Sequence, residues 1–253
     1  MSQFPLSLKP SLSVFLCYSL PSYILSATAS SVELSKTSLA RVSNSTANFS
    51  ASYSAYQQAV TDNNDADIFK YSAESYELGR KKFGDKSLDT ANLALNYAAA
   101  LELQDKSLGE NAINEPREQA HQLYLTALAI YEVEYGDDGV DVLDPLLGAA
   151  ITNSKLKLAR SQLRQAVEIA ADSERPLLLA SVLMSAFNEL KNTEYYDRRV
   201  RDYALNSFEI YQQELPPNAL KRVEATYIVG MIWLAENRES KAIPLFEEVA
   251  LCA

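Results

Sequence analysis

From about residue 47 to the C-terminus, apolar residues recur at the three- and four-residue spacing of amphipathic helices. Polar or Gly-containing turns interrupt this pattern at Thr61–Asp65, Phe83–Asp85 and Tyr135–Asp137. We expect Asp65 or Asp67 to be the N-cap of the helix after the first turn. The pattern predicts an all-α chain, with later helices at about 140–156, 158–172, 175–191, 195–214, 218–236 and 239–251.

One stretch, Thr226–Val249, shows how these helices are expected to pack. An apolar helix carries Gly230, a polar turn follows, and the next helix carries Ala242 with Phe246 four residues later. Small residues allow two antiparallel helices to cross closely, and an aromatic side chain fills the remaining gap. The spacing therefore predicts a helical hairpin in which Ala242 lies at the crossing and Phe246 is buried behind it.

Looser copies of this unit recur along the chain. A small residue is followed four positions later by a large apolar one in five places: Ser72/Tyr76, Ala120/Tyr124, Ala159/Leu163, Ala204/Phe208 and Ala242/Phe246. In addition, Phe83-Gly84-Asp85 and Tyr135-Gly136-Asp137 are related by an offset of 52 residues. Repeated helical hairpins stack into solenoids, so we predict an α-α superhelix of about five helix pairs in preference to an irregular bundle.

The sequence resembles tetratricopeptide (TPR) repeats, and in particular the long-helix type of kinesin light chains. The matching pieces are Ala127–Tyr131, the aromatic-Gly-Asp at 135–137, and Asp89-Thr90-Ala91 leading to Asn96. The resemblance implies a groove in which the asparagine at position 96 binds a peptide backbone, although the next repeat has Gly148 at the corresponding position. The residues predicted to bind a peptide are Asn92, Asn96, Tyr227 and Trp233.

Residues 1–29 have the features of a secretory signal peptide: Lys9, the apolar stretch Leu12–Leu25 and a small-x-small site at Ala27-Thr28-Ala29. We interpret 30–46 as a Ser/Thr-rich leader with a weak helix, and 47–253 as the TPR-like domain. The expected location is periplasmic or secreted, with no integral membrane segment after cleavage. An exported acidic array is also similar to the N-terminal halves of some TonB-family energy transducers, which gives a second hypothesis.

The composition argues against nucleic-acid binding and against a metal site. The net charge of −10 argues against nucleic-acid binding, because phosphate backbones repel acidic proteins. The single histidine, His121, and one cysteine outside the signal peptide, Cys252, cannot form a zinc site, so we expect no metal or cofactor. We interpret the basic run Arg198–Arg201 as a solvated surface, and likewise the acidic residues Glu132, Glu134, Asp137, Asp138, Asp141 and Asp144.

These observations predict a non-enzymatic exported scaffold that binds a protein or peptide in its concave groove. The alternatives are the N-terminal part of a TonB-family protein and a hydrolase that uses acidic residues. A hydrolase would require two carboxylates held together, one of them with a raised pKa. Because the last residues, Ala250–Ala253, are apolar, we expect that this end either continues in a longer protein or is covered by self-association through the C-terminal helix.

Overall fold

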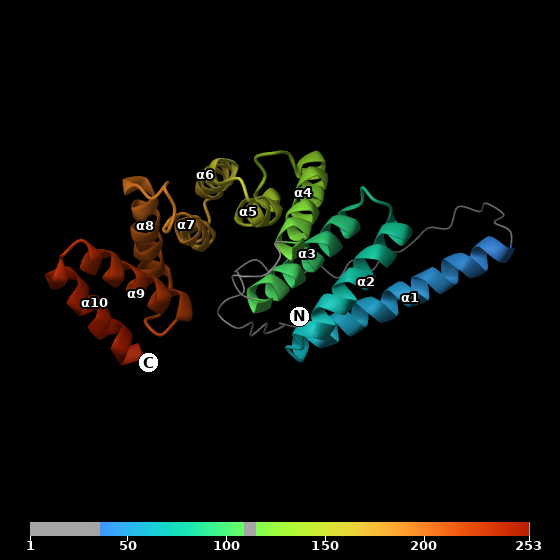
Figure 1. The fold of residues 1–253 in the computed structure, drawn as a ribbon, viewed down its shortest axis with the longest axis horizontal. Helices are drawn as coiled ribbons and strands as arrows, with labels where there is room; N and C mark the ends of the chain where they lie inside the picture. The colour runs from blue at the N-terminus through green and yellow to red at the C-terminus, as the bar shows by residue number, and fades with distance from the viewer. Residues whose placement is uncertain (1–35, 109–114, 253) are drawn as a thin grey trace. The chain divides into compact units, whose positions relative to one another are not determined.

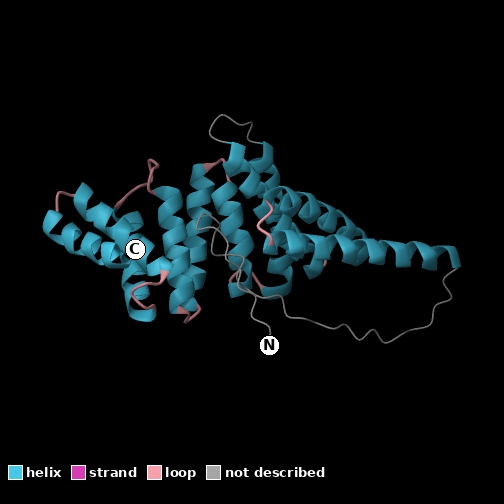
Figure 2. Cartoon of the chain, turned by 90° about the horizontal axis from the view of Figure 1, so that it is seen from below, coloured by secondary structure: helices cyan, strands magenta, loops and turns pink. Residues whose placement is uncertain are grey.

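The computed structural model describes residues 36–108 and 115–252, and all regular structure in these ranges is helical (Figure 2). The fold class predicted from the sequence, all-α, is confirmed. The predicted signal peptide, residues 1–29, lies outside the described residues. The chain divides into two compact units, Met1–Glu134 and Tyr135–Ala253.

Unit 1 contains α1 (Lys36–Thr61), α2 (Asp65–Phe83), α3 (Leu88–Leu108) and α4 (Glu115–Tyr135), whose last residue lies at the unit boundary (Figure 1). Helix α1 begins within the segment interpreted as the leader. The pairing of α1 with α2 is antiparallel, because Phe49 contacts Phe83 with ring centroids 5.1 Å apart, whereas the hydroxyls of Ser52 and Ser75 lie 3.0 Å apart. Helices α2 and α3 are also antiparallel, with Tyr97 against Tyr76 and Leu93 against Gly79.

The ends of these helices explain part of the sequence pattern. The N-cap of α2 is Asn64, whose side-chain oxygen accepts a hydrogen bond from the Asp67 backbone N–H at 3.2 Å. The prediction of Asp65 or Asp67 was wrong, because both residues are already inside the helix. Gly84 and Gly136 have φ angles of +90° and +85°, which L-residues with a side chain rarely adopt. The 52-residue similarity therefore arises because α2 and α4 both end at a glycine with a positive φ angle.

Unit 2 begins with a short 3-10 helix, η2 (Val140–Val142), and contains the remaining helices: α5 (Leu143–Thr152), α6 (Leu156–Asp172), α7 (Pro176–Leu190), α8 (Arg198–Glu214), α9 (Leu220–Ala235) and α10 (Glu239–Cys252). The α-helix predicted at 140–156 is shorter than expected, since η2 replaces its start and Asn153 is extended. Within the unit, consecutive helices pack on one another. For example, the buried Ser207 hydroxyl of α8 donates to the Ala180 carbonyl of α7 at 2.7 Å.

The small residues of the recurring pattern all lie at helix contacts. They are at most 1% exposed and occur on every second helix, namely Ser72, Ala120, Ala159, Ala204 and Ala242 on α2, α4, α6, α8 and α10. The ten α-helices of the described residues pack in adjacent pairs, as the sequence predicted. The prediction for Phe246 was only partly right: Ala242 is buried, whereas Phe246 is half-buried, with its ring 5.9 Å from the exposed Tyr227 ring.

Candidate protein-binding surface

The four residues predicted to bind a peptide lie in different units. Asn92 and Asn96 are on α3 of unit 1, and Tyr227 and Trp233 are on α9 of unit 2. We therefore describe them as two separate surfaces.

On α3, the two asparagines differ in their hydrogen bonding. The Asn92 side-chain oxygen accepts a hydrogen bond of 2.5 Å from the Tyr131 hydroxyl of α4, so this amide helps to hold two helices together. Asn96 lies one turn later and is half-buried, and its amide makes no hydrogen bond to a described residue. Of the two, Asn96 is the side chain with donors and acceptors left for a ligand.

On α9, Tyr227 and Trp233 point to different faces. They are six residues apart, which corresponds to a rotation of about 240° around the helix. Trp233 is half-buried, and Lys241 and Arg238 lie 4.6 and 5.2 Å from its ring centroid. The Trp233 ring thus forms cation–π contacts within the α9–α10 hairpin, whereas Tyr227 remains 50% exposed.

Tyr227 belongs to a row of exposed apolar side chains that we call the α9 stripe. Its members are Leu220, Tyr227, Met231 and Leu234, which are 58%, 50%, 44% and 44% exposed. Their spacings of seven, four and three residues place them on one face of the helix. Glu224 lies on the same face, and burial raises the pKa of its carboxyl, an effect that the nearby Lys221 partly opposes.

Most of the acidic residues singled out from the sequence are exposed, as expected for a solvated turn: Glu132, Glu134, Asp137, Asp138 and Asp141. Asp144 is different. Part of its surface is accessible, but burial, together with the charge of Asp141, raises the pKa of its carboxyl to about 7. At the 52-residue offset its counterpart is Asn92, which accepts a hydrogen bond from Tyr131. Asp144 has no such hydrogen bond to a described residue.

The sequence also singled out the basic run and the histidine. Arg201 is paired with Glu236 at 2.8 Å and Asp202 at 3.2 Å, so part of the basic run stabilises the fold. His121 is half-buried on α4. Within 36–108 and 115–252, no group of three or more His, Cys, Asp or Glu side chains is placed to hold a metal ion.

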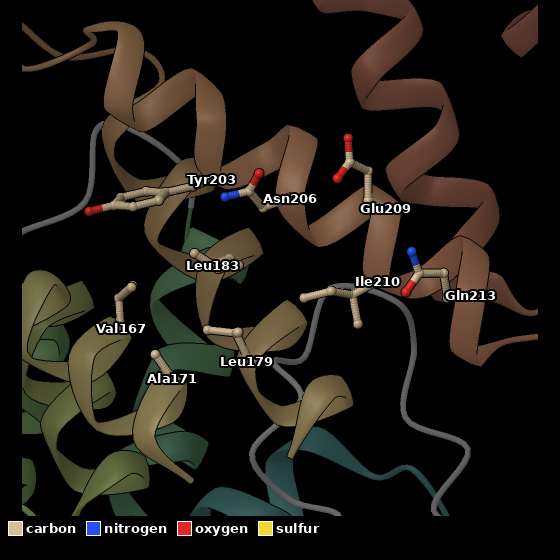
Figure 3. Close-up of a pocket in the computed structure, with 9 residues that line it drawn as sticks. All are labelled: Val167, Ala171, Leu179, Leu183, Tyr203, Asn206, Glu209, Ile210 and Gln213. Atoms are coloured by element: carbon tan, nitrogen blue, oxygen red, sulfur yellow. The ribbon is translucent and has the colours of Figure 1, made fainter. Parts of the chain in front are cut away.

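The sequence did not single out a groove in unit 2, which has a volume of about 480 Å³ (Figure 3). Side chains from three consecutive helices, α6, α7 and α8, line it: Val167, Ala171, Leu179, Leu183, Tyr203, Asn206, Glu209, Ile210 and Gln213. The available signal was the helical spacing of 167/171 on one helix and of 203/206/210 on another. Spacing alone could not indicate that these two rows line the same groove.

Comparison with known proteins does not assign this chain to a family. No protein-family model matches the sequence, and no curated protein is significantly similar to it. None of the helices in the described ranges is both long and apolar enough to cross a membrane.

Proposed function

We propose that this protein is a non-enzymatic, TPR-like scaffold whose α9 stripe binds an amphipathic helix of another protein. The observation that carries this proposal is the α9 stripe itself, in which four large apolar side chains are each at least 44% exposed on one helix face. Single exposed apolar residues are ordinary, but several of them on one face of a helix are typical of an interaction site. The predicted residue Tyr227 lies within this row.

The spacing of the stripe favours a helical partner. The apolar residues of the stripe are three, four and seven residues apart. An amphipathic partner helix has apolar anchors at the same spacings, so its apolar face can pack along α9. Leu220 and Leu234 mark the two ends of the row, fourteen residues apart, which corresponds to about 21 Å along α9. A partner helix of about four turns would cover the stripe.

Charge indicates which amphipathic helix would fit. The chain carries a net charge of −10, and Glu224 is the acidic side chain within the stripe. Covering Glu224 with apolar surface alone would leave a buried, unpaired carboxylate, which is costly. We therefore expect the partner to place a Lys or Arg beside its apolar anchors.

A designed peptide can test this proposal. The probe is an amphipathic helix of about 18 residues with a leucine face and lysines beside it, and the matched control has glutamates in place of the lysines. Calorimetry with the full chain should detect binding of the lysine peptide only. The double substitution Tyr227→Ala and Met231→Ala should weaken binding by about tenfold or more, because it removes two of the four anchors.

Matched variants distinguish the α9 stripe from other exposed apolar residues. Ile243→Ala removes a side chain that is 53% exposed on α10, outside the stripe, and should leave the affinity unchanged. Glu224→Gln should weaken binding of the lysine peptide, but not of a peptide with glutamine at those positions. Equal binding of the acidic peptide, or binding that survives the Tyr227/Met231 double substitution, would refute the proposal.

One observation favours the alternative of a hydrolase that uses acidic residues. Asp144 has a carboxyl pKa raised to about 7 and a carboxylate neighbour in Asp141, which is the combination such an enzyme requires. Against it, the groove of unit 2 is lined by other residues. The alternative would gain support if purified protein hydrolysed a glycoside or ester substrate and Asp144→Asn abolished the turnover.

A further inference from the structure

The groove in unit 2 has an apolar floor that is separate from the α9 stripe. Five of its nine lining residues are aliphatic: Val167 and Ala171 of α6, Leu179 and Leu183 of α7, and Ile210 of α8 (Figure 3). Its volume of about 480 Å³ lies within the range that sites for small organic ligands usually have. This volume is large enough to hold a small apolar ligand.

One end of the groove is cationic. Tyr203 is only 8% exposed, and the charges of Arg199, Arg164 and Arg160 all oppose the rise in the Tyr203 pKa that burial causes. These three guanidinium groups therefore lie close enough to the Tyr203 hydroxyl to act on it electrostatically. Asp197 acts on Tyr203 in the opposite direction, so the charges near this hydroxyl comprise three cations and one anion.

Two of the three arginines are available to a ligand. Arg160 is already bonded to Asp197 at 3.1 Å and lies 4.8 Å from the Tyr195 ring centroid. Arg164 and Arg199 are exposed, and neither forms a direct ion pair with a carboxylate of the described residues, although Arg199 interacts electrostatically with Asp197. The Tyr203 hydroxyl likewise makes no hydrogen bond to a described residue.

The helical spacing places these arginines beside the groove. Arg164 precedes Val167 by three residues and Ala171 by seven, so all three share one face of α6. On α8, Arg199 precedes Tyr203 by four residues and Asn206 by seven. On α6 and on α8 an arginine thus precedes the lining residues on the same helix face, Arg164 from the middle of α6 and Arg199 from the first turn of α8.

We propose that this groove binds a free, single-chain anionic amphiphile, such as a long-chain carboxylate. Its head group lies between Arg164 and Arg199 beside the Tyr203 hydroxyl, and its apolar chain lies along the floor formed by α6 and α7. Glu209, the acidic lining residue, is six residues beyond Tyr203 on α8, or about 9 Å along the helix. An anion at the Tyr203 end is thereby kept away from the Glu209 carboxylate. The site uses no residue of the α9 stripe and does not depend on the function proposed above.

Dodecanoate, used below its micellar concentration, is a suitable probe for calorimetry with the full chain. The double substitution Arg164→Gln and Arg199→Gln should weaken dodecanoate binding by about tenfold or more, because the head group loses both unpaired cations. Arg198→Gln is the matched control, since Arg198 is one residue away and its side chain is 86% exposed. That control should bind dodecanoate with unchanged affinity.

A second variant tests the apolar part of the site without relying on charge. Ala171 is exposed at the groove, so Ala171→Trp fills the groove without disturbing a buried position, and it should abolish binding while the melting temperature is preserved. The Tyr227→Ala, Met231→Ala variant should bind dodecanoate normally. Wild-type affinity in the Ala171→Trp variant would overturn the proposal.

The chemistry of the head group is tested with other ligands. Dodecyltrimethylammonium has a similar chain with a positive head, and binding of it as tight as that of dodecanoate would overturn the proposal. Vesicles of anionic phospholipid should not bind, because their chains are buried in the bilayer. Vesicle binding that competed with dodecanoate would assign the surface to membranes instead and would also overturn the proposal.

Discussion

The ring of Phe246 on α10 lies directly against the backbone of Gly230 on α9. A Cβ atom added to Gly230 would be 2.8 Å from Cε1 and 3.0 Å from Cζ of this ring. Non-bonded carbon atoms prefer a separation of about 3.5–4.0 Å, so no side chain fits at position 230 while Phe246 keeps its place. This contact sets how closely the two helices of the last pair approach.

The first prediction concerns this contact. Glycine inside a helix is less favourable than alanine by about 1 kcal/mol, yet Gly230→Ala should destabilise the protein because the new Cβ displaces Phe246. In a Phe246→Leu background the same change should be neutral or stabilising. A double-mutant cycle by urea unfolding, followed by the fluorescence of the only tryptophan, Trp233, measures the coupling. Equal effects in both backgrounds would contradict the contact.

A second prediction tests the close crossing at Ala242, which is 1% exposed. Ala242→Leu adds atoms to a filled contact between α9 and α10, and we expect it to lower the free energy of unfolding by about 1–3 kcal/mol. Ala250→Leu is the control, because Ala250 is exposed on the same helix and should be tolerated. A melting temperature equal to that of the wild type would mean that position 242 is not at the crossing.

The third prediction is a pH dependence that originates from Asp144. Its carboxyl pKa is about 7 in the folded protein, whereas aspartate in an unfolded chain has a pKa of about 3.9. The folded state therefore binds this proton more tightly. The stability that this carboxyl contributes is fully present below about pH 4 and is lost as the pH rises through about 7.

Asp144→Asn removes this titration. At about pH 8 the variant should unfold with a free energy about 1–3 kcal/mol higher than that of the wild type, and at about pH 4 the two should be similar. Urea unfolding across this pH range measures the difference. Asp141→Asn should lower the pKa of Asp144, because it removes the neighbouring negative charge. A constant difference between variant and wild type at all pH values would rule out Asp144 as its source.

The fourth prediction concerns export. If residues 1–29 are a signal peptide, mass spectrometry of the periplasmic or secreted product should find Ser30 as its first residue. Replacing Leu16 with Arg in the apolar stretch should retain the precursor in the cytoplasm. Recovery of a cytoplasmic protein that still begins at Met1 would contradict export.

The fifth prediction concerns self-association through the C-terminal helix. Leu251 on α10 is 89% exposed, and a second copy of the chain could cover it. Sedimentation should then show a dimer that Leu251→Glu converts to a monomer, whereas Leu158→Glu, at a site 51% exposed on α6, should not. A wild-type protein that sediments as a monomer at high concentration would exclude this association.

Much of the fold could be predicted from the sequence, because local patterns determine it. The apolar spacing predicted the helices, and the recurring Ser72, Ala120, Ala159, Ala204 and Ala242 predicted the pairing, since a close helix contact requires a small residue. The Phe83-Gly84-Asp85 motif predicted a helix end because few residues other than glycine adopt a positive φ. These features depend on residues close together in the chain.

The candidate sites depended on tertiary structure. The sequence predicted that both Asn92 and Asn96 bind a ligand. In the structure, α4 packs on α3, and the Asn92 side chain accepts a hydrogen bond from Tyr131, which lies 39 residues later in the chain. The sequence predicted that Asp144 is solvated, whereas burial within the fold, together with the charge of Asp141, raises the pKa of that carboxyl. Arg164 precedes Tyr203 by 39 residues, and only the fold brings its charge near the Tyr203 hydroxyl. Local spacing determines which residues share a helix face, whereas long-range packing decides which faces are covered and which stay open to a ligand.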